Sequence, residues 1–236
     1  RMTNLVSSLN DLARAYSCDF SMAARHFETG ANVGRHADRH VVLASTYKIA
    51  IAVTALRQVA DGKLSLSQQV EVLPIDYVAP GPVSECLMDE GTCLPFITLL
   101  RLMMTHSDNS ATDVVLRVIG GPAVVQQRLQ DLGVKPFNVS RNTRDLIRAY
   151  LDYPPLEKML ANGLTMAQAM LDSGAAPDMA AHSDRLLNDT AWHSRFSADP
   201  QDKGSADAMI DLLVKITHGT ALAPTERAVL LSIMEG

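Results

Sequence analysis

The sequence is poor in aromatic residues, in cysteine and in basic charge, and it has no long hydrophobic run. Aromatic side chains make up 5% of the 236 residues, with Trp192 as the one tryptophan, so the core must consist of aliphatic residues, alanine and methionine. No apolar stretch approaches the roughly 18 residues of a membrane-spanning helix, so no membrane span is predicted. A net charge of −5 gives no electrostatic footprint for nucleic acid, which is therefore not expected as a partner.

The three cysteines do not form a disulfide framework, because their number is small and odd. Cys86 and Cys93 flank a short loop and could pair, which would still leave at least one free thiol. The chain does not open on the basic, apolar and small-residue succession of a signal peptide. Such a segment is removed on maturation, so the sequence by itself leaves the location open.

Hydrophobic residues make up 47% of the chain, and in most segments they recur at helical spacing. Phe20–Glu28 and Val33–His36 read as a hairpin around a Thr29-Gly30-Ala31-Asn32 turn. Residues 74–95, rich in proline and glycine, predict a long loop, and residues 153–204 mix short helical runs with polar connections. Helices are predicted near residues 5–16, 45–61, 96–104, 111–119, 123–132, 143–151, 205–216 and 224–235. The prediction is a helix-rich α/β (α+β) fold with about ten helices and two strands, an odd balance because an isolated hairpin is marginal.

One local pattern carries chemistry. Ser45 precedes Lys48 by three positions at the start of an apolar helix, which places both side chains on one face of the first turn. A lysine among apolar neighbours has its charged form disfavoured and can act as a base on a hydroxyl. Of the six lysines, only Lys48 has a serine three residues before it. The alternative is a helix-capping serine beside a solvated lysine.

A second pattern, Ser107-Asp108-Asn109, lies at the end of the predicted 96–106 helix. By itself it fits a loop in which Asp and Asn hydrogen-bond the backbone. Metalloprotease, nucleophile-elbow and phosphate-loop motifs are absent from the sequence. Neither a metal nor a cofactor is therefore predicted.

Together the two patterns resemble class A β-lactamases and penicillin-binding serine hydrolases, whose signature combines Ser-x-x-Lys, Ser-Asp-Asn and Lys-Thr-Gly. The stretches 20–38, 61–72, 105–112 and 202–213 are also similar to that family. The resemblance implies a nucleophile at Ser45 and a proton acceptor at Lys48. It also implies proton relay by Ser107 to the leaving β-lactam nitrogen, and substrate contact by Asn109.

The family pattern breaks at the carboxylate that activates the deacylating water. No Glu-x-x-Leu-Asn occurs, and the nearest string runs from Asp184 to Asn188, with the shorter aspartate in place of glutamate. We predict Asp184 as the deacylation base and Asn188 as a substrate-binding partner. Asp145 is the alternative base, and a plain solvated helix position for Asp184 is equally consistent.

The pattern also breaks at the C-terminal side, because the chain contains no Lys-Thr-Gly. In the family that motif lies on a strand after the helix resembled by 224–235. The sequence therefore predicts that the sheet strands of this fold follow Gly236 or come from elsewhere, or that the protein is degenerate. Residues 1–44 with 205–236 are predicted to form an α/β subdomain. Residues 45–204 are predicted to form an all-helical subdomain with an omega-loop-like segment.

The resemblance implies a β-lactamase that acts through an acyl-enzyme on Ser45. A penicillin-binding enzyme or esterase with slow deacylation is the first alternative, and a non-catalytic binding or sensor module is the second. A small-molecule β-lactam is the implied partner, the chain is expected to be a monomer, and a periplasmic or secreted location is implied.

Overall fold

In the computed structural model, residues 2–17, 20–171 and 178–235 are described, and helices dominate them. Up to residue 131 the longer helices are α1 (Met2–Ala15), α2 (Lys48–Ala60), α4 (Phe96–Thr105), α5 (Asn109–Ile119) and α6 (Pro122–Asp131). After them come α7 (Thr143–Leu151), α8 (Pro154–Ala161), α9 (Met166–Leu171), α10 (Met179–Asn188), α11 (Thr190–Ala198), α12 (Ala206–Thr217) and α13 (Pro224–Glu235). A short helix, α3 (Pro82–Cys86), and 3-10 turns at Ala44–Tyr47 and Pro74–Asp76 complete the helical part.

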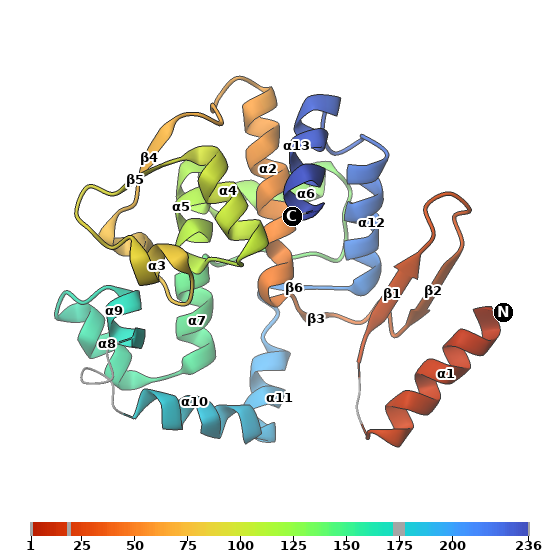
Figure 1. The fold of residues 1–236 in the computed structure, drawn as a ribbon. Coiled ribbons are helices and arrows are strands. Elements are labelled where there is room, and N and C mark those ends of the chain that lie inside the picture. Colours follow the sequence, from red (N-terminus) through yellow and green to blue (C-terminus); the bar gives the residue numbers. More distant parts are fainter. Residues whose placement is uncertain (1, 18–19, 172–177, 236) are drawn as a thin grey trace.

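Helix α2 runs through the middle of the molecule, and α4, α5, α6 and α13 pack against it (Figure 1). Its sequence is apolar on most sides, so Ile51, Ala55 and Leu56 are fully buried there. Phe96 and Leu99 of α4 and Leu212 of α12 belong to the same core. This packing fixes the N-terminal end of α2, where Ser45 and Lys48 lie.

The strands are short and pair in twos. The hairpin β1 (Met22–Arg25) and β2 (Asn32–Arg35) is antiparallel, with α1 against β2 and α12 against β1. Strands β3 (Val41–Val42) and β6 (Lys203–Gly204) form an antiparallel pair although they lie far apart in the sequence. Strand β4 (Gln69–Glu71) pairs with β5 (Cys93–Pro95). The β3–β6 pair brings residue 204 back beside the segment that leads into Ser45.

The two ends of segment 141–202 meet at Asp202, at a point here called the neck. The backbone N–H groups of Ser140 and Arg141 donate to one carboxylate oxygen of Asp202, at 2.8 and 3.1 Å. The Arg141 guanidinium pairs with the same carboxylate and with Asp199. Helices α7 and α11, which begin and end this segment, lie next to the start of α2 (Figure 1). The neck therefore holds a helical segment beside Ser45.

The fold confirms the helix-rich prediction and most of its boundaries. The structure differs within residues 74–95, which contain a 3-10 turn, α3 and β5 in place of a continuous loop. It also has six strands among the described residues where the sequence predicted two, since strands of two or three residues leave no readable periodicity. Cys86 and Cys93 are both free and exposed. No helix among the described residues is long and apolar enough to cross a membrane.

Candidate active site

Ser45 lies in the 3-10 turn directly before α2, and its side chain is exposed. Lys48 is the first residue of α2 and is 3% exposed. The residue before Ser45, Ala44, has a φ of +44°, in the left-handed region that costs a non-glycine residue on the order of 1 kcal/mol. Strain of this kind persists only where the surrounding packing enforces it. The turn thus holds the hydroxyl in solvent while the amine beside it is buried.

The second serine is held by a buried aspartate. Ser107 has a φ of +53° and lies between α4 and α5. Asp108, fully buried, accepts from the N–H of Ala111 at the start of α5 and from the N–H of Val83, both at 2.8 Å. Asp108 therefore caps α5 and ties it to α3, which fixes the residues on either side, Ser107 and Asn109.

Four of the predicted site residues form one hydrogen-bonded cluster. Lys48 Nζ lies 3.0 Å from Ser107 Oγ, 2.6 Å from the Ser107 carbonyl oxygen and 3.0 Å from Asn109 Oδ1. Ser107 Oγ in turn lies 3.0 Å from Ser45 Oγ and donates to it. The result is a continuous chain of polar atoms from the ammonium group through one hydroxyl to the other.

The environment of Lys48 makes a neutral amine accessible near physiological pH. Burial lowers the pKa of Lys48 from its ordinary 10.5 to about 8, and the negative charges of Asp108 and Asp113 partly oppose that shift. A lysine with a pKa of about 8 is unprotonated in about a tenth of the molecules at pH 7. The site therefore contains an amine that can accept a proton.

Ser45 and Lys48 open into a cavity of about 360 Å³, here called the Ser45 cavity. Its floor comes from the α2 start and from α5, and its far wall comes from α7 and α11. The lining residues are Val42, Ala44, Ser45, Tyr47, Lys48, Asn109, Thr143, Leu146, Ile147, Tyr150, His193, Phe196 and Ser197. Seven of these thirteen side chains are aliphatic or aromatic, so the cavity suits a ligand with an apolar part near the nucleophile.

A buried carboxylate beneath the cavity positions α7. Asp113 on α5 accepts from the N–H groups of Thr143 and Arg144, at 2.7 and 2.9 Å, in the first turn of α7. Thr143 Oγ1 lies 2.6 Å from the hydroxyl of Tyr47, the neighbour of Lys48. Asp113 thus connects the helix of the second serine, the start of α7 and the turn of the nucleophile. Burial raises the pKa of Asp113 from 3.8 to about 6.

We expect Asp113 to make the stability of the protein depend on pH. The folded state holds the Asp113 proton up to about pH 6, while the unfolded chain releases it near 3.8, so this group's contribution falls as the pH rises through that window. Asp113→Asn removes that contribution. Between pH 4 and pH 7 the free energy of unfolding of the wild type should fall by about 2 kcal/mol relative to that of the variant. Urea unfolding at several pH values checks this, and a difference that stays constant contradicts it.

The structure does not bring the predicted deacylation residues to the cavity. Asp184 and Asn188 lie exposed on α10, where the Asn188 amide donates to the Asp184 backbone carbonyl, and neither lines the Ser45 cavity. Asp145 lies on α7 and pairs with Arg148 at 3.1 Å, and it does not line the cavity either. The role of Asp184 and Asn188 stays a prediction that this geometry does not support.

The cavity wall contains residues that the sequence did not single out. Tyr150 on α7 and Phe196 on α11 face the Ser45 cavity, with His193 one turn before Phe196. They come from helices far apart in the sequence, and no local spacing links them. Aromatic residues are scarce in the sequence, but their number does not show which of them meet at one cavity.

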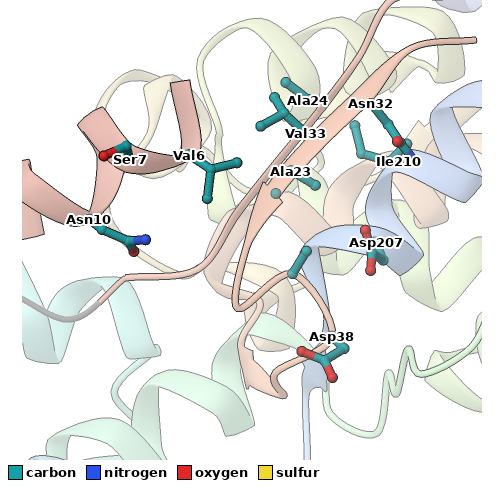
Figure 2. Close-up of a pocket in the computed structure, with 12 residues that line it drawn as sticks. Val6, Ser7, Asn10, Ala23, Ala24, Asn32, Val33, Asp38, Asp207 and Ile210 are labelled. Carbon is teal, nitrogen blue, oxygen red and sulfur yellow. The ribbon is translucent and has the colours of Figure 1, made fainter. Parts of the chain in front are cut away.

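A larger cavity, of about 890 Å³, lies between α1, the β1–β2 hairpin and α12. Figure 2 shows Val6 and Asn10 of α1 on one side of it and Asp207 of α12 on the other. The described residues that line it include a serine, Ser7, but no lysine, histidine or cysteine to activate a hydroxyl. In the ranges that the structure describes, no group of three or more metal-ligating side chains occurs. The Ser45 cavity is therefore the candidate active site.

Comparison with known proteins defines the class. A model of the β-lactamase enzyme family matches residues 4–236. The chain is 32% identical over 100 residues to the extended-spectrum β-lactamase PER-1 of Pseudomonas aeruginosa, covering 42% of this chain and 32% of that protein. It is 26% identical over 203 residues to β-lactamase CTX-M-6 of Salmonella typhimurium, covering 85% of this chain and 52% of that one. A crystal structure of a β-lactamase from Chitinophaga pinensis matches with a TM-score of 0.71 at 22% identity, covering 98% of this chain and 69% of that one.

The helix-rich fold is that of class A β-lactamases and penicillin-binding proteins. The chain belongs to the β-lactamase enzyme family. It spans about half or less of the length of these curated relatives. The predicted family and fold class are thereby confirmed.

Proposed function

We propose that the protein is a serine enzyme that is acylated by β-lactams at Ser45. The observation that carries this proposal is the chain of hydrogen-bonding atoms from Lys48 Nζ through Ser107 Oγ to Ser45 Oγ, with both separations 3.0 Å. An exposed hydroxyl, a second hydroxyl and an amine of lowered pKa are the groups that nucleophilic acyl transfer requires. The family match supports the same chemistry.

The hydrogen-bonded chain supplies a path for the proton of the nucleophile. With Lys48 neutral, the two hydroxyl groups rotate so that Ser45 donates to Ser107 Oγ and Ser107 donates to the amine. The Ser45 proton then passes to Ser107 Oγ while the Ser107 proton passes to Lys48 Nζ. Ser45 Oγ then bonds to the β-lactam carbonyl carbon. When the ring C–N bond breaks, the electron pair stays on nitrogen. The proton returns from Lys48 through Ser107 to that nitrogen, so Lys48 is neutral again and the product is an ester on Ser45.

Asn109 has a double role in this proposal. Its Oδ1 accepts from Lys48 and its Nδ2 donates to the Ala79 carbonyl, both at 3.0 Å. The amide group carries a second N–H, and Asn109 lines the Ser45 cavity. We propose that this N–H donates to a polar group of the bound β-lactam while Oδ1 orients Lys48.

Slow deacylation is the second candidate, and the cavity lining favours it over rapid hydrolysis. Among the described residues that line the Ser45 cavity, none is aspartate or glutamate. A carboxylate that activates water must lie within hydrogen-bond reach of that water.

A periplasmic or secreted location, a monomeric state and the division into two subdomains stay predictions.

Rapid mixing of the full-length protein with a chromogenic cephalosporin tests the proposal. We expect a burst of ring opening equal to the enzyme concentration, followed by a slow steady phase. Rapid turnover without a burst would instead identify a deacylation base, and Asp184→Asn would then show whether it is Asp184. No ring opening at all would favour the non-catalytic alternative.

A further inference from the structure

The far wall of the Ser45 cavity is an aromatic cluster within segment 141–202. Trp192 is buried on α11, and its ring stacks on that of Phe196 with centroids 5.0 Å apart and planes 11° from parallel. The Tyr150 ring of α7 meets both edge-on, at 4.6 Å from Trp192 and 5.4 Å from Phe196. We call Tyr150, Trp192 and Phe196 the aromatic wall.

Ring packing and the anchoring of segment 141–202 hold the aromatic wall in place. Trp192 supports Phe196 from behind, and the edge-on contacts of Tyr150 bridge the two helices in the geometry that aromatic pairs prefer. The neck formed by Arg141 and Asp202 anchors both ends of the segment that carries these rings. Tyr150 and Phe196 are nevertheless only partly buried, and both face the cavity that contains Ser45.

The described residues that line the Ser45 cavity carry little charge, which favours a ligand with an uncharged side chain. Lys48 is the only lysine or arginine among the described residues around the cavity, and Ser107 and Asn109 already engage it. No carboxylate lines the cavity in that part of the chain. An anionic or cationic side chain on the ligand would therefore lose its hydration here without gaining an ion-pair partner, apart from His193. An apolar ring would instead bury its surface against Tyr150, Phe196, Leu146 and Ile147.

We propose that the aromatic wall binds the side chain of the acyl donor, so that the site prefers β-lactams whose side chain carries an aromatic ring over those with a small or charged one. This inference rests on the proposed acylation of Ser45, because the same cavity contains the nucleophile and the wall. Phe196 and Tyr150 are the specificity-determining residues. These two residues raise the acylation rate constant only when the side chain of the donor carries a ring.

Second-order acylation rate constants for two probes test the inference. Benzylpenicillin carries a phenyl ring on its side chain, and 6-aminopenicillanic acid carries none. We expect Phe196→Ala to slow acylation by benzylpenicillin about tenfold, the loss of one aromatic contact with its buried area, and to change that by 6-aminopenicillanic acid less than about twofold. Phe196→Leu, which keeps an apolar side chain, should lie between. Phe27→Ala, on the distant hairpin loop, is the matched control.

The outcomes separate this inference from the proposed function. Equal losses for both probes in Phe196→Ala, or no preference for benzylpenicillin in the wild type, would overturn the inference while leaving acylation established. Absence of acylation by either probe would overturn the proposed function. The fluorescence of Trp192 gives a second readout in Ser45→Ala, which cannot be acylated. Benzylpenicillin is expected to change it and 6-aminopenicillanic acid is not, with Trp192→Phe as the blank, and identical responses to both would contradict the wall's role.

Discussion

Ser45→Ala is expected to abolish labelling of the protein by a fluorescent penicillin and to reduce antibiotic consumption to the rate without enzyme. The hydroxyl oxygen is the atom that bonds to the carbonyl carbon, and alanine offers nothing in its place. Lys48 and Ser107 would remain in position, but neither replaces the nucleophile. Effects of this size accompany removal of a covalent nucleophile, since the other site groups act only through it.

The same substitution should leave the fold intact. Ser45 is exposed, and its side chain accepts only the hydrogen bond from Ser107 among the interactions of the described residues. Substitution of such a residue changes the free energy of unfolding by about 0.5 kcal/mol or less. Ser67→Ala, an exposed serine outside the Ser45 cavity, is the matched control and should label normally. An unfolded Ser45→Ala protein, seen by circular dichroism, would count against the assignment.

Lys48→Met is expected to lower the acylation rate constant by about a thousandfold. Methionine fills similar space in the buried position but cannot accept the Ser45 proton, and removal of a positioned base costs roughly 10² to 10⁴ in rate. The Ser107 carbonyl and Asn109 Oδ1 would also lose the donor that they share. Single-turnover labelling of variant and wild type gives the ratio. A reduction below about tenfold would mean that another group accepts the proton.

The pH dependence of acylation provides the matching signature. Because the neutral amine is the active form and burial lowers the pKa of Lys48 to about 8, the wild-type rate constant should rise tenfold per pH unit below 7 and level off above 8. The Lys48→Met variant should show no such rise. A wild-type profile that is flat from pH 6 to pH 9 would contradict the role of Lys48 as the base.

The sequence predicted those parts of the fold that depend on local pattern. Helices such as α7 and α13 carry their apolar residues at helical spacing, and the β1–β2 hairpin carries its own turn. Strands β3 and β6 could not be predicted, because each has two residues and its partner lies far along the chain. Pairing of that kind is decided by tertiary packing and not by propensity.

The same division holds in the site. Ser45 with Lys48 is a local spacing and Ser107 with Asn109 is a compact motif, so both could be found from the residues. The distances that join the two motifs depend on the packing of α2 against α5. Likeness to a family string points to Asp184, but α10 leaves this residue exposed and outside the Ser45 cavity. Tyr150 and Phe196 meet only because the neck folds α11 back beside α7.

Intact-mass spectrometry of the full-length protein after brief incubation with benzylpenicillin, followed by peptide mapping, tests the central claim most directly. We predict a mass increase of one penicillin molecule, located on the peptide that contains Ser45. An adduct on any other residue would contradict the account. So would an unmodified protein that leaves the antibiotic unconsumed.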